Sequence, residues 1–358
     1  MRRASLLLLA SIFTLACGST GTEEAGGAGG ATITGVSSSS SSSHAHAASS
    51  STSKAAASSS SGAPEGKGPP YPFVLAHGFF GFQNFAGSNF ETYFYQLKDY
   101  LTTLGFEVYT PAVDPFNDST TRGAELASKI QDILAETGAA KVNIVGHSQG
   151  GLDARVVAHD HPELVASVVT IATPHYGSPV ADVALKLVSD PNAEQAISDL
   201  ANLLGAPIYG GEIDPSSDIW KPIHLFSQPG IAAFNAMYPN APGVFYASVT
   251  GRSSLALDDG DCAPDVAQPF VTTYAVDLDT IDPDLALFAT ICAGTDGAKN
   301  DGLVRVKDGK WGEFWGCEPA DHLDEVGQLF GDPPGPGNAF DYKAMFVGIL
   351  TAIRAKGF

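Results

Sequence analysis

The segment Gly146-His147-Ser148-Gln149-Gly150 constrains the fold more strongly than any other part of the chain. An apolar run typical of a strand leads into it at 142–146, and residues 150–159 after it have the spacing of a helix. A serine at such a junction sits on a sharp turn with strained backbone, and the flanking glycines let strand and helix approach closely. The segment therefore predicts a strand, a tight turn and a helix in immediate succession.

Strand and helix patterns alternate on both sides of this turn. Further strand-like runs lie at 71–76, 106–110 and 164–172, and helical spacing of apolar residues is found at 90–104, 123–137 and 342–355. Alternation of this kind is typical of an α/β protein with a doubly wound, mostly parallel sheet and helices on both faces. We expect one such domain over residues 71–358.

The first residues have the pattern of an export signal. Arg2 and Arg3 precede an apolar run, 4–16, that is too short to span a bilayer as a helix, so residues 1–16 are predicted to be a signal peptide. The sequence Thr14-Leu15-Ala16-Cys17 resembles the lipobox of bacterial lipoproteins. This resemblance implies lipidation at Cys17 and an outer-membrane or cell-surface location. The alternative is ordinary secretion, with Cys17 unmodified.

Residues 17–70 have the composition of a tether. Between Ser37 and Ser61, 15 of 25 residues are serine, and most of the others are alanine. No periodic apolar face is present to compensate for the entropy of ordering, so we expect a flexible coil.

Charge excludes several classes of partner. The formal net charge is −20, with 39 acidic and 19 basic residues. Such a chain repels phosphate backbones, so no nucleic-acid partner is expected. The same repulsion disfavours lasting adsorption to anionic lipid headgroups, so membrane attachment is expected through the N-terminal lipid only.

Ser148 is the candidate nucleophile, and a serine needs a histidine to take its proton. His322 lies in a late loop that can reach the turn, and Asp301 is the candidate acid, following a strand-like run and a loop rich in small residues. Asp321 and Asp324 are too close to His322 in sequence for the usual arrangement of these three groups.

An oxyanion formed at Ser148 needs backbone N–H donors from two places. One candidate is Gln149, directly after the serine, and the other is Phe79, in the loop that follows the first central strand. Gly78 allows the backbone to turn so that the Phe79 N–H faces the site.

Together these residues resemble the bacterial true lipases of the Pseudomonas/Burkholderia type, in the α/β-hydrolase superfamily. The segments that carry the resemblance are FVLAHGFFGF (73–82), VNIVGHSQGGLDAR (142–155), VASVVTIATPHYGS (165–178), FNAMYP (234–239), NDGLV (300–304) and HLDEV (322–326). The resemblance implies a triad of Ser148, Asp301 and His322, oxyanion donors at Phe79 and Gln149, and hydrolysis of acylglycerols at a lipid–water interface. Two alternatives remain open, namely an esterase or polyester hydrolase with the same triad and a non-catalytic surface-binding lipoprotein.

The resemblance also implies one structural Ca²⁺ ion beside the catalytic histidine. Asp324 matches one carboxylate ligand, and Gln328 and Asp332 match two backbone-carbonyl positions. Asp282 fits the other carboxylate best, with Asp279 as the alternative. Ca²⁺ is coordinated by oxygen atoms of this kind.

The remaining expectations concern the lid, the partners and the cysteines. A helical lid is expected at about 185–215, where apolar residues share one helical face, although such a face is usual for a packed surface helix too. The family resemblance allows for a foldase chaperone, and a monomer is expected.

Family members with a disulfide place a cysteine shortly after the catalytic acid, and this chain has none there. Cys262–Cys317 is the first choice of pair, with Cys292 as the other candidate.

Overall fold

A computed structural model describes most of the chain after residue 65. The described residues are 66–79, 93–188, 220–253, 261–271, 279–283, 285–331, 334–335 and 337–358. The predicted signal peptide, Cys17, nearly all of the tether, Asp332 and most of the expected lid lie outside them. Within them, we find no helix whose length and apolar character would allow it to cross a membrane.

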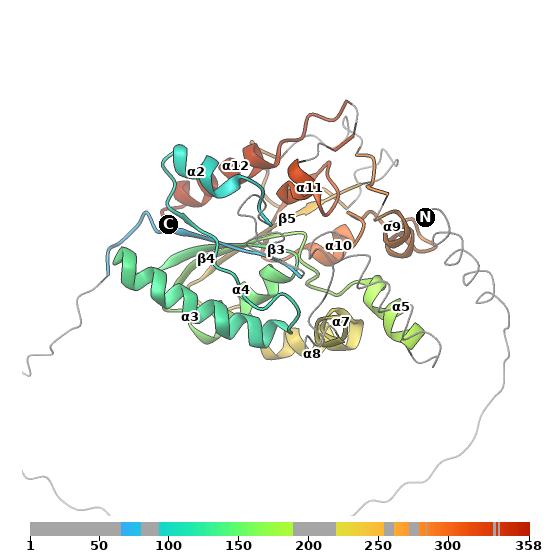
Figure 1. Cartoon of the computed structure of the whole chain (residues 1–358), viewed down its shortest axis with the longest axis horizontal. Helices are drawn as coiled ribbons and strands as arrows, with labels where there is room; N and C mark the ends of the chain where they lie inside the picture. Colours follow the sequence, from blue (N-terminus) through green and yellow to red (C-terminus); the bar gives the residue numbers. More distant parts are fainter. Residues whose placement is uncertain are drawn as a thin grey trace, which may run out of the picture. The chain divides into compact units, whose positions relative to one another are not determined.

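A six-stranded, wholly parallel sheet forms the centre of the folded region (Figure 1). In spatial order the strands are β2 (Val108–Tyr109), β1 (Phe73–Ala76), β3 (Val142–His147), β4 (Val165–Ile171), β5 (Phe245–Gly251) and β6 (Glu313–Glu318). The order reverses between β1 and β3, and in such sheets ligands bind at the carboxyl ends of the strands beside this point. The predicted fold class is confirmed.

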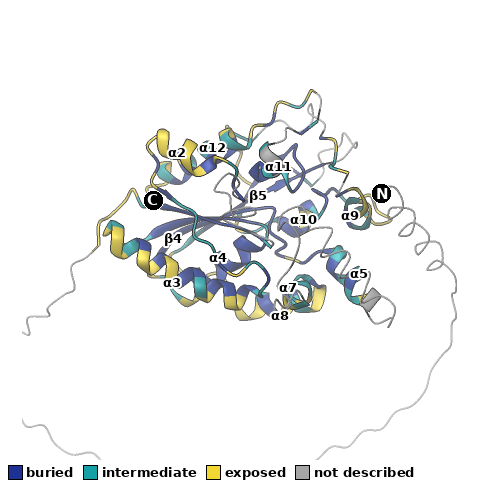
Figure 2. Ribbon diagram, viewed as in Figure 1, coloured by how far each residue is buried: buried dark blue, intermediate teal, exposed yellow. Residues whose placement is uncertain are grey.

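Helices cover both faces of the sheet (Figure 1). One face carries α2 (Leu97–Thr103) and α12 (Tyr342–Ala355), and the other carries α3 (Ser119–Thr137) and α4 (Gln149–Asp160). Side chains alternate along a strand, so Phe73 and Leu75 of β1 pack toward α2 and α12, while Val74 packs toward α3. The strands β1, β3 and β4 are buried throughout, and the exposed residues lie on the outward sides of the helices and in the loops (Figure 2).

Most predicted elements are present with small shifts in their ends. The helix α3 begins four residues earlier than expected, because the side chain of Asp118 caps it by accepting from the Thr121 N–H. The helix expected over 90–104 is shorter than predicted. Residues 93–96 form turns instead, and Gln96 has a left-handed backbone with φ of 51°, so α2 begins only at Leu97.

Several elements that shape the site were not predicted. Neither β5 nor β6 was expected, and the run before Asp301 forms the helix α9 (Ala286–Ala293) rather than a strand. Among the residues that the structure describes, the remaining helices are α5 (Pro179–Val188), α7 (Trp220–Phe226), α8 (Gln228–Met237), α10 (Val306–Gly309) and α11 (Gln328–Gly331), with a 3₁₀ turn, η1, at Asp324–Val326. Contacts of the folded region begin by Lys67, whose backbone pairs with Ala139 ahead of β3.

Candidate active site

Ser148 stands where β3 ends and α4 begins. Its backbone has φ of 54° and ψ of −128°, a strained conformation for a residue with a side chain. A Cβ atom on Gly146 would lie 2.6 Å from the Gly151 Cα, so glycine is needed for the strand and the helix to approach this closely. Thr173 Oγ1 donates to the Ser148 carbonyl oxygen at 2.7 Å. The geometry is that of the predicted strand, tight turn and helix.

His322 and Asp301 are hydrogen-bonded to each other beside this turn. His322 Nδ1 lies 2.8 Å from Asp301 Oδ2, and both side chains are buried. The second oxygen, Asp301 Oδ1, accepts from the backbone N–H groups of Leu303 and Val304 at 2.8 and 2.6 Å. Hydrogen bonds thus fix both oxygens of the carboxylate. Because Asp301 contacts Nδ1 of His322, the other ring nitrogen, Nε2, is the candidate base atom.

The His322 ring lies beside the turn of Ser148 because it packs on the ring of His147. The two ring centroids lie 4.5 Å apart, and His147 is the residue directly before Ser148. The structure therefore brings together the parts of the chain that hold all three predicted triad residues, although Ser148 and His322 are far apart in sequence.

The loop after β1 lies directly against the nucleophile. A Cβ atom on Gly78 would stand 2.7 Å from the Ser148 Cβ, so only glycine lets the backbone that leads to Phe79 pass this close. The Phe79 ring packs edge-on against Phe116 and Phe226. Gln149 is the first residue of α4, where backbone N–H groups have no partner within the helix. Both candidate oxyanion donors thus flank Ser148.

Arg122, which sequence reasoning did not identify, holds the loop after β1 in place. It projects from α3, is fully buried, and donates to the carbonyl oxygens of His77 at 2.6 Å, Gly78 at 3.3 Å and Asp114 at 2.7 Å. Its Nε donates to Asp153 Oδ2 at 2.8 Å in a buried ion pair. A charged residue on the apolar side of the 123–137 pattern was the available signal. The loop that carries the Phe79 N–H is therefore held by a guanidinium rather than by solvent.

Burial and the Arg122 charge set the protonation of the groups around it. Both lower the pKa of His77 to about 3, so this ring is neutral, and its Nε2 accepts from the Val113 N–H at 3.1 Å. Burial raises the pKa of Asp153 to about 6 although the guanidinium of Arg122 opposes the shift. The ion pair thus offsets only part of the desolvation of the carboxylate.

Three buried carboxylates gather beside the loop of His322. Asp279, Asp321 and Asp324 offer ligand oxygens within 4.8 Å of one another. Burial raises the pKa of Asp279 and of Asp321 to about 6, although hydrogen bonds to both carboxyl groups oppose the shift. Repulsion from Asp279 adds to the shift of Asp321. Clustered carboxylate oxygens are the donors that hard divalent cations such as Ca²⁺ prefer. The residues present therefore fit such an ion.

The group differs from the predicted ligand set. Its first carboxylate is Asp279, the alternative, whereas the preferred candidate Asp282 is not a member and instead donates its backbone N–H to Asp321 Oδ2 at 2.8 Å. Asp321 belongs to the group but was not predicted as a ligand. Gln328 opens α11, one turn beyond Asp324. Asp282 was preferred because it matched the family's ligand position best, and a match in sequence does not reveal which carboxylates come together in space.

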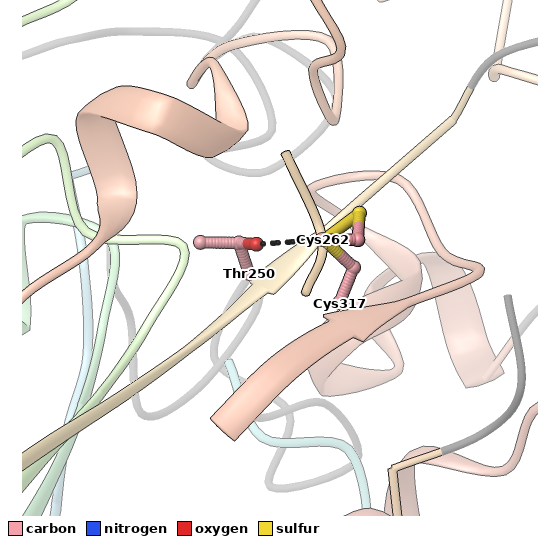
Figure 3. The surroundings of a disulfide bond; sticks show 3 residues. All are labelled: Thr250, Cys262 and Cys317. Carbon is pink, nitrogen blue, oxygen red and sulfur yellow. Dashed lines mark hydrogen bonds between the residues drawn. A yellow bond between two sulfur atoms is a disulfide. The ribbon is translucent and has the colours of Figure 1, made fainter. Parts of the chain in front are cut away.

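A disulfide joins Cys262 to Cys317, at the end of β6, with the sulfur atoms 2.07 Å apart (Figure 3). Both residues are buried, and Thr250 Oγ1 lies 3.4 Å from the Cys317 sulfur. The first choice of pairing is confirmed, and Cys292 is free and buried. The cross-link holds the strand that leads, five residues later, to His322.

Comparison with known proteins agrees with this geometry. A family model described as the alpha/beta hydrolase fold matches residues 71–240. A protein of Pseudarthrobacter phenanthrenivorans named triacylglycerol lipase is 33% identical over 292 residues, which covers 73% of this chain and 90% of that protein. A triacylglycerol lipase of Vibrio cholerae is 46% identical over 81 residues, or 23% of this chain, and this match spans only 25% of that relative's length.

A solved structure supports the fold. The structure of EstA from Clostridium botulinum aligns with a TM-score of 0.54 at 20% identity, covering 81% of this chain and 89% of that one. The chain shares this fold, has a serine on the strained turn between β3 and α4, and is similar to a relative along most of that relative's length. It therefore belongs to the α/β-hydrolase family, together with bacterial proteins named triacylglycerol lipases.

Proposed function

We propose that this protein hydrolyses carboxylic esters of acylglycerols through a Ser-His-Asp acyl-enzyme mechanism. The observation that carries the proposal is the His322–Asp301 hydrogen bond of 2.8 Å beside a serine on a strained turn. A serine, a base and an acid that orients the base form the arrangement by which hydrolases activate a serine hydroxyl. The choice of substrate rests on the relatives named triacylglycerol lipases.

In the first half of the reaction, Ser148 Oγ attacks the ester carbonyl carbon while its proton passes to His322 Nε2. The carbonyl oxygen becomes an oxyanion, which accepts from the N–H groups of Phe79 and Gln149. The tetrahedral intermediate then collapses. The bond from carbon to the alcohol oxygen breaks, the alcohol leaves with the proton from His322, and an acyl-enzyme remains on Ser148.

In the second half, a water molecule gives a proton to His322 and attacks the acyl carbon. Collapse of this intermediate returns the proton to Ser148 and releases the fatty acid. Asp301 does not take up a proton. It holds His322 in the tautomer with Nδ1–H and stabilises the imidazolium, and its own orientation is fixed by the N–H groups of Leu303 and Val304.

The test is turnover of emulsified long-chain triacylglycerol and of soluble p-nitrophenyl acetate by the wild type and by Ser148→Ala. We expect activity on the emulsion in the wild type, and loss on the order of 10⁶-fold in the variant. Activity on the soluble ester alone would change the substrate assignment to an esterase. No serine-dependent activity on either substrate, or on a polyester film, would favour a surface-binding protein.

We propose further that Asp279, Asp321 and Asp324 hold a structural Ca²⁺ ion, with backbone oxygens near Gln328 completing the ligand set. The grouping of three buried carboxylates supports this site. When bound, the ion supplies neutralising charge and cross-links the loop of His322, and it takes no part in bond making. Catalysis is sensitive to displacements of about 1 Å, so a firmly held loop favours turnover.

For the N-terminal part, we propose export by the signal at 1–16, lipidation at Cys17 and a tether to about residue 70. The resemblance to a lipobox and the serine-rich composition support this reading. It would place the enzyme at the outer membrane or cell surface, and without lipidation it would be secreted. Globomycin, which inhibits the lipoprotein signal peptidase, should cause precursor to accumulate, and palmitate labelling that persists in Cys17→Ser would refute the proposal.

A lid near 185–215, a foldase partner and a monomeric state complete the proposal. The first four residues of this range end α5, directly before the part of the chain that is not described. Refolding of the denatured protein without any partner to full activity would remove the foldase from the proposal.

A further inference from the structure

Three buried polar side chains that the proposed mechanism does not use form a continuous chain beneath the active site. Tyr93 Oη lies 2.5 Å from His147 Nδ1, and His147 Nε2 lies 3.0 Å from Glu325 Oε2. Tyr93 is 4% exposed, and His147 and Glu325 are fully buried. The three residues come from separate parts of the sequence, since 178 positions separate His147 from Glu325. We call them the Tyr93–His147–Glu325 chain.

Each end of this chain lies against one of the two loops that the proposed reaction requires, the oxyanion loop and the loop of His322. At one end, Tyr93 Oη lies directly against Gly78, the glycine that leads into the oxyanion donor Phe79, and a Cβ atom on Gly78 would stand 2.6 Å from it. At the other end, Glu325 Oε2 lies 4.0 Å from His322 Nδ1, and Glu325 Oε1 lies against Gly251 at the end of β5. The chain therefore spans from the oxyanion loop to the loop of the base.

The middle of the chain is fixed to the nucleophile by covalent connection. His147 is the last residue of β3 and directly precedes Ser148. Its ring also packs on the His322 ring at 4.5 Å and on the Tyr93 ring at 5.6 Å. A shift in either neighbouring loop is thus opposed by a strand of the central sheet.

Burying a hydrogen-bonded chain of polar side chains costs free energy of folding. Buried polar groups carry a desolvation penalty that apolar side chains of similar shape avoid, and they fix one arrangement only when each member has a partner. A neutral imidazole provides one donor and one acceptor, which suits a link between a phenol and a carboxyl group. The result is a single geometry for three loops that meet at the serine.

We propose that the Tyr93–His147–Glu325 chain sets the distance between the oxyanion donor and the base, so that these three are positioning residues for the hydrolysis. The inference rests on the proposed function and deepens it. The chain makes no contact with the ester. It acts through Gly78, which leads into the oxyanion donor Phe79, and through His322, which receives the proton in the same transition state.

The test is a double-mutant cycle of Tyr93→Phe and Glu325→Met, measured on soluble p-nitrophenyl butyrate. Tyr93→Phe removes the hydroxyl that reaches His147 Nδ1, and Glu325→Met removes the oxygen that reaches His147 Nε2. Each single variant therefore breaks the chain at one end and keeps the approximate size of the side chain. We expect kcat to fall by about 10- to 100-fold in each, as displacements near 1 Å can cost 10²-fold, with KM within about threefold. The double variant should lose no more than about threefold beyond the worse single one, because a chain broken once no longer couples its ends.

Two controls separate this role from packing and from the proposed function. Tyr246→Phe removes another buried phenol hydroxyl, which accepts from the Ala241 N–H near the opposite end of β5, and should leave kcat unchanged. Ser148→Ala tests the function itself, since activity that depends on Ser148 stands whether or not the chain matters. Should Glu325→Met not fold, His147→Phe takes its place, because it removes both ring nitrogens of the chain and keeps an aromatic ring.

Three results would overturn the proposal. One is wild-type kcat in Tyr93→Phe. Another is a double variant whose loss equals the product of the two single losses. The third is an equal loss of kcat in Tyr246→Phe, which would mean that any buried hydroxyl has this effect. The rate at which a p-nitrophenyl phosphonate phosphonylates Ser148, with release of nitrophenolate, gives an independent readout, and we expect it to fall in parallel with kcat.

Discussion

Replacing Arg122 with leucine should weaken both the fold and the oxyanion loop, and a second substitution separates the two effects. Arg122 and Asp153 are both buried, so the single variant leaves a carboxylate without its counter-ion. Loss of one partner of a buried pair costs about 3–5 kcal/mol, whereas replacement of both by apolar residues is often neutral. The double variant Arg122→Leu/Asp153→Leu should therefore recover most of the lost free energy of unfolding.

Activity should not recover with stability. The carbonyl oxygens of His77, Gly78 and Asp114 lose their donor in both variants, because Arg122 donates to all three. Removal of a whole oxyanion donor costs about 10²- to 10³-fold in kcat, so a loosened one should cost about 10- to 100-fold. Urea unfolding and kcat on a soluble ester measure the two effects separately. Wild-type kcat in the stable double variant would refute the role given to Arg122.

Three further outcomes are expected. Cys262→Ala/Cys317→Ala should lose about 4 kcal/mol of unfolding free energy by the loop-entropy relation for a separation of 55 residues, and an unchanged urea midpoint would contradict this. Ca²⁺ at 100 times its Kd should stabilise the wild type by about 2.7 kcal/mol but not Asp324→Ala, and an equal rise in melting temperature in both would remove Asp324 from the site. The pKa of Asp153 is raised to about 6, so the folded state keeps a proton that the unfolded state has released. Stability should therefore fall as pH rises from about 4 to about 6, and the fall should be smaller in Asp153→Asn, as measured by urea unfolding across that range.

The fold could be predicted from local pattern because β1, β3 and β4 are rich in branched aliphatic residues. Parallel strands buried on both faces give that signal, as in residues 142–146. The later strands β5 and β6 were missed, since FYASVTG and EFWGCE carry polar and small residues that interrupt the run. The helix α9 was taken for a strand because short apolar runs look alike in either state.

The candidate site was predictable only where a motif or the resemblance named the residue. Ser148, Asp301 and His322 each lie in such a motif, and the structure brings Asp301 and His322 into contact. Arg122 lies in no motif, and Glu325 lies in HLDEV, which gave it no role of its own. The partners of both residues are fixed by tertiary contacts that periodicity does not reveal. The same limit explains the choice of Asp282 over Asp279.

The most direct measurement of the central claim is covalent labelling by a p-nitrophenyl phosphonate, which reacts only with an activated serine. We expect a burst of one nitrophenolate per chain and, by mass spectrometry, an adduct on the peptide that contains Ser148. The burst should be absent in Ser148→Ala and strongly slowed in His322→Ala. An adduct on another residue, or ester hydrolysis that persists in Ser148→Ala, would contradict the account.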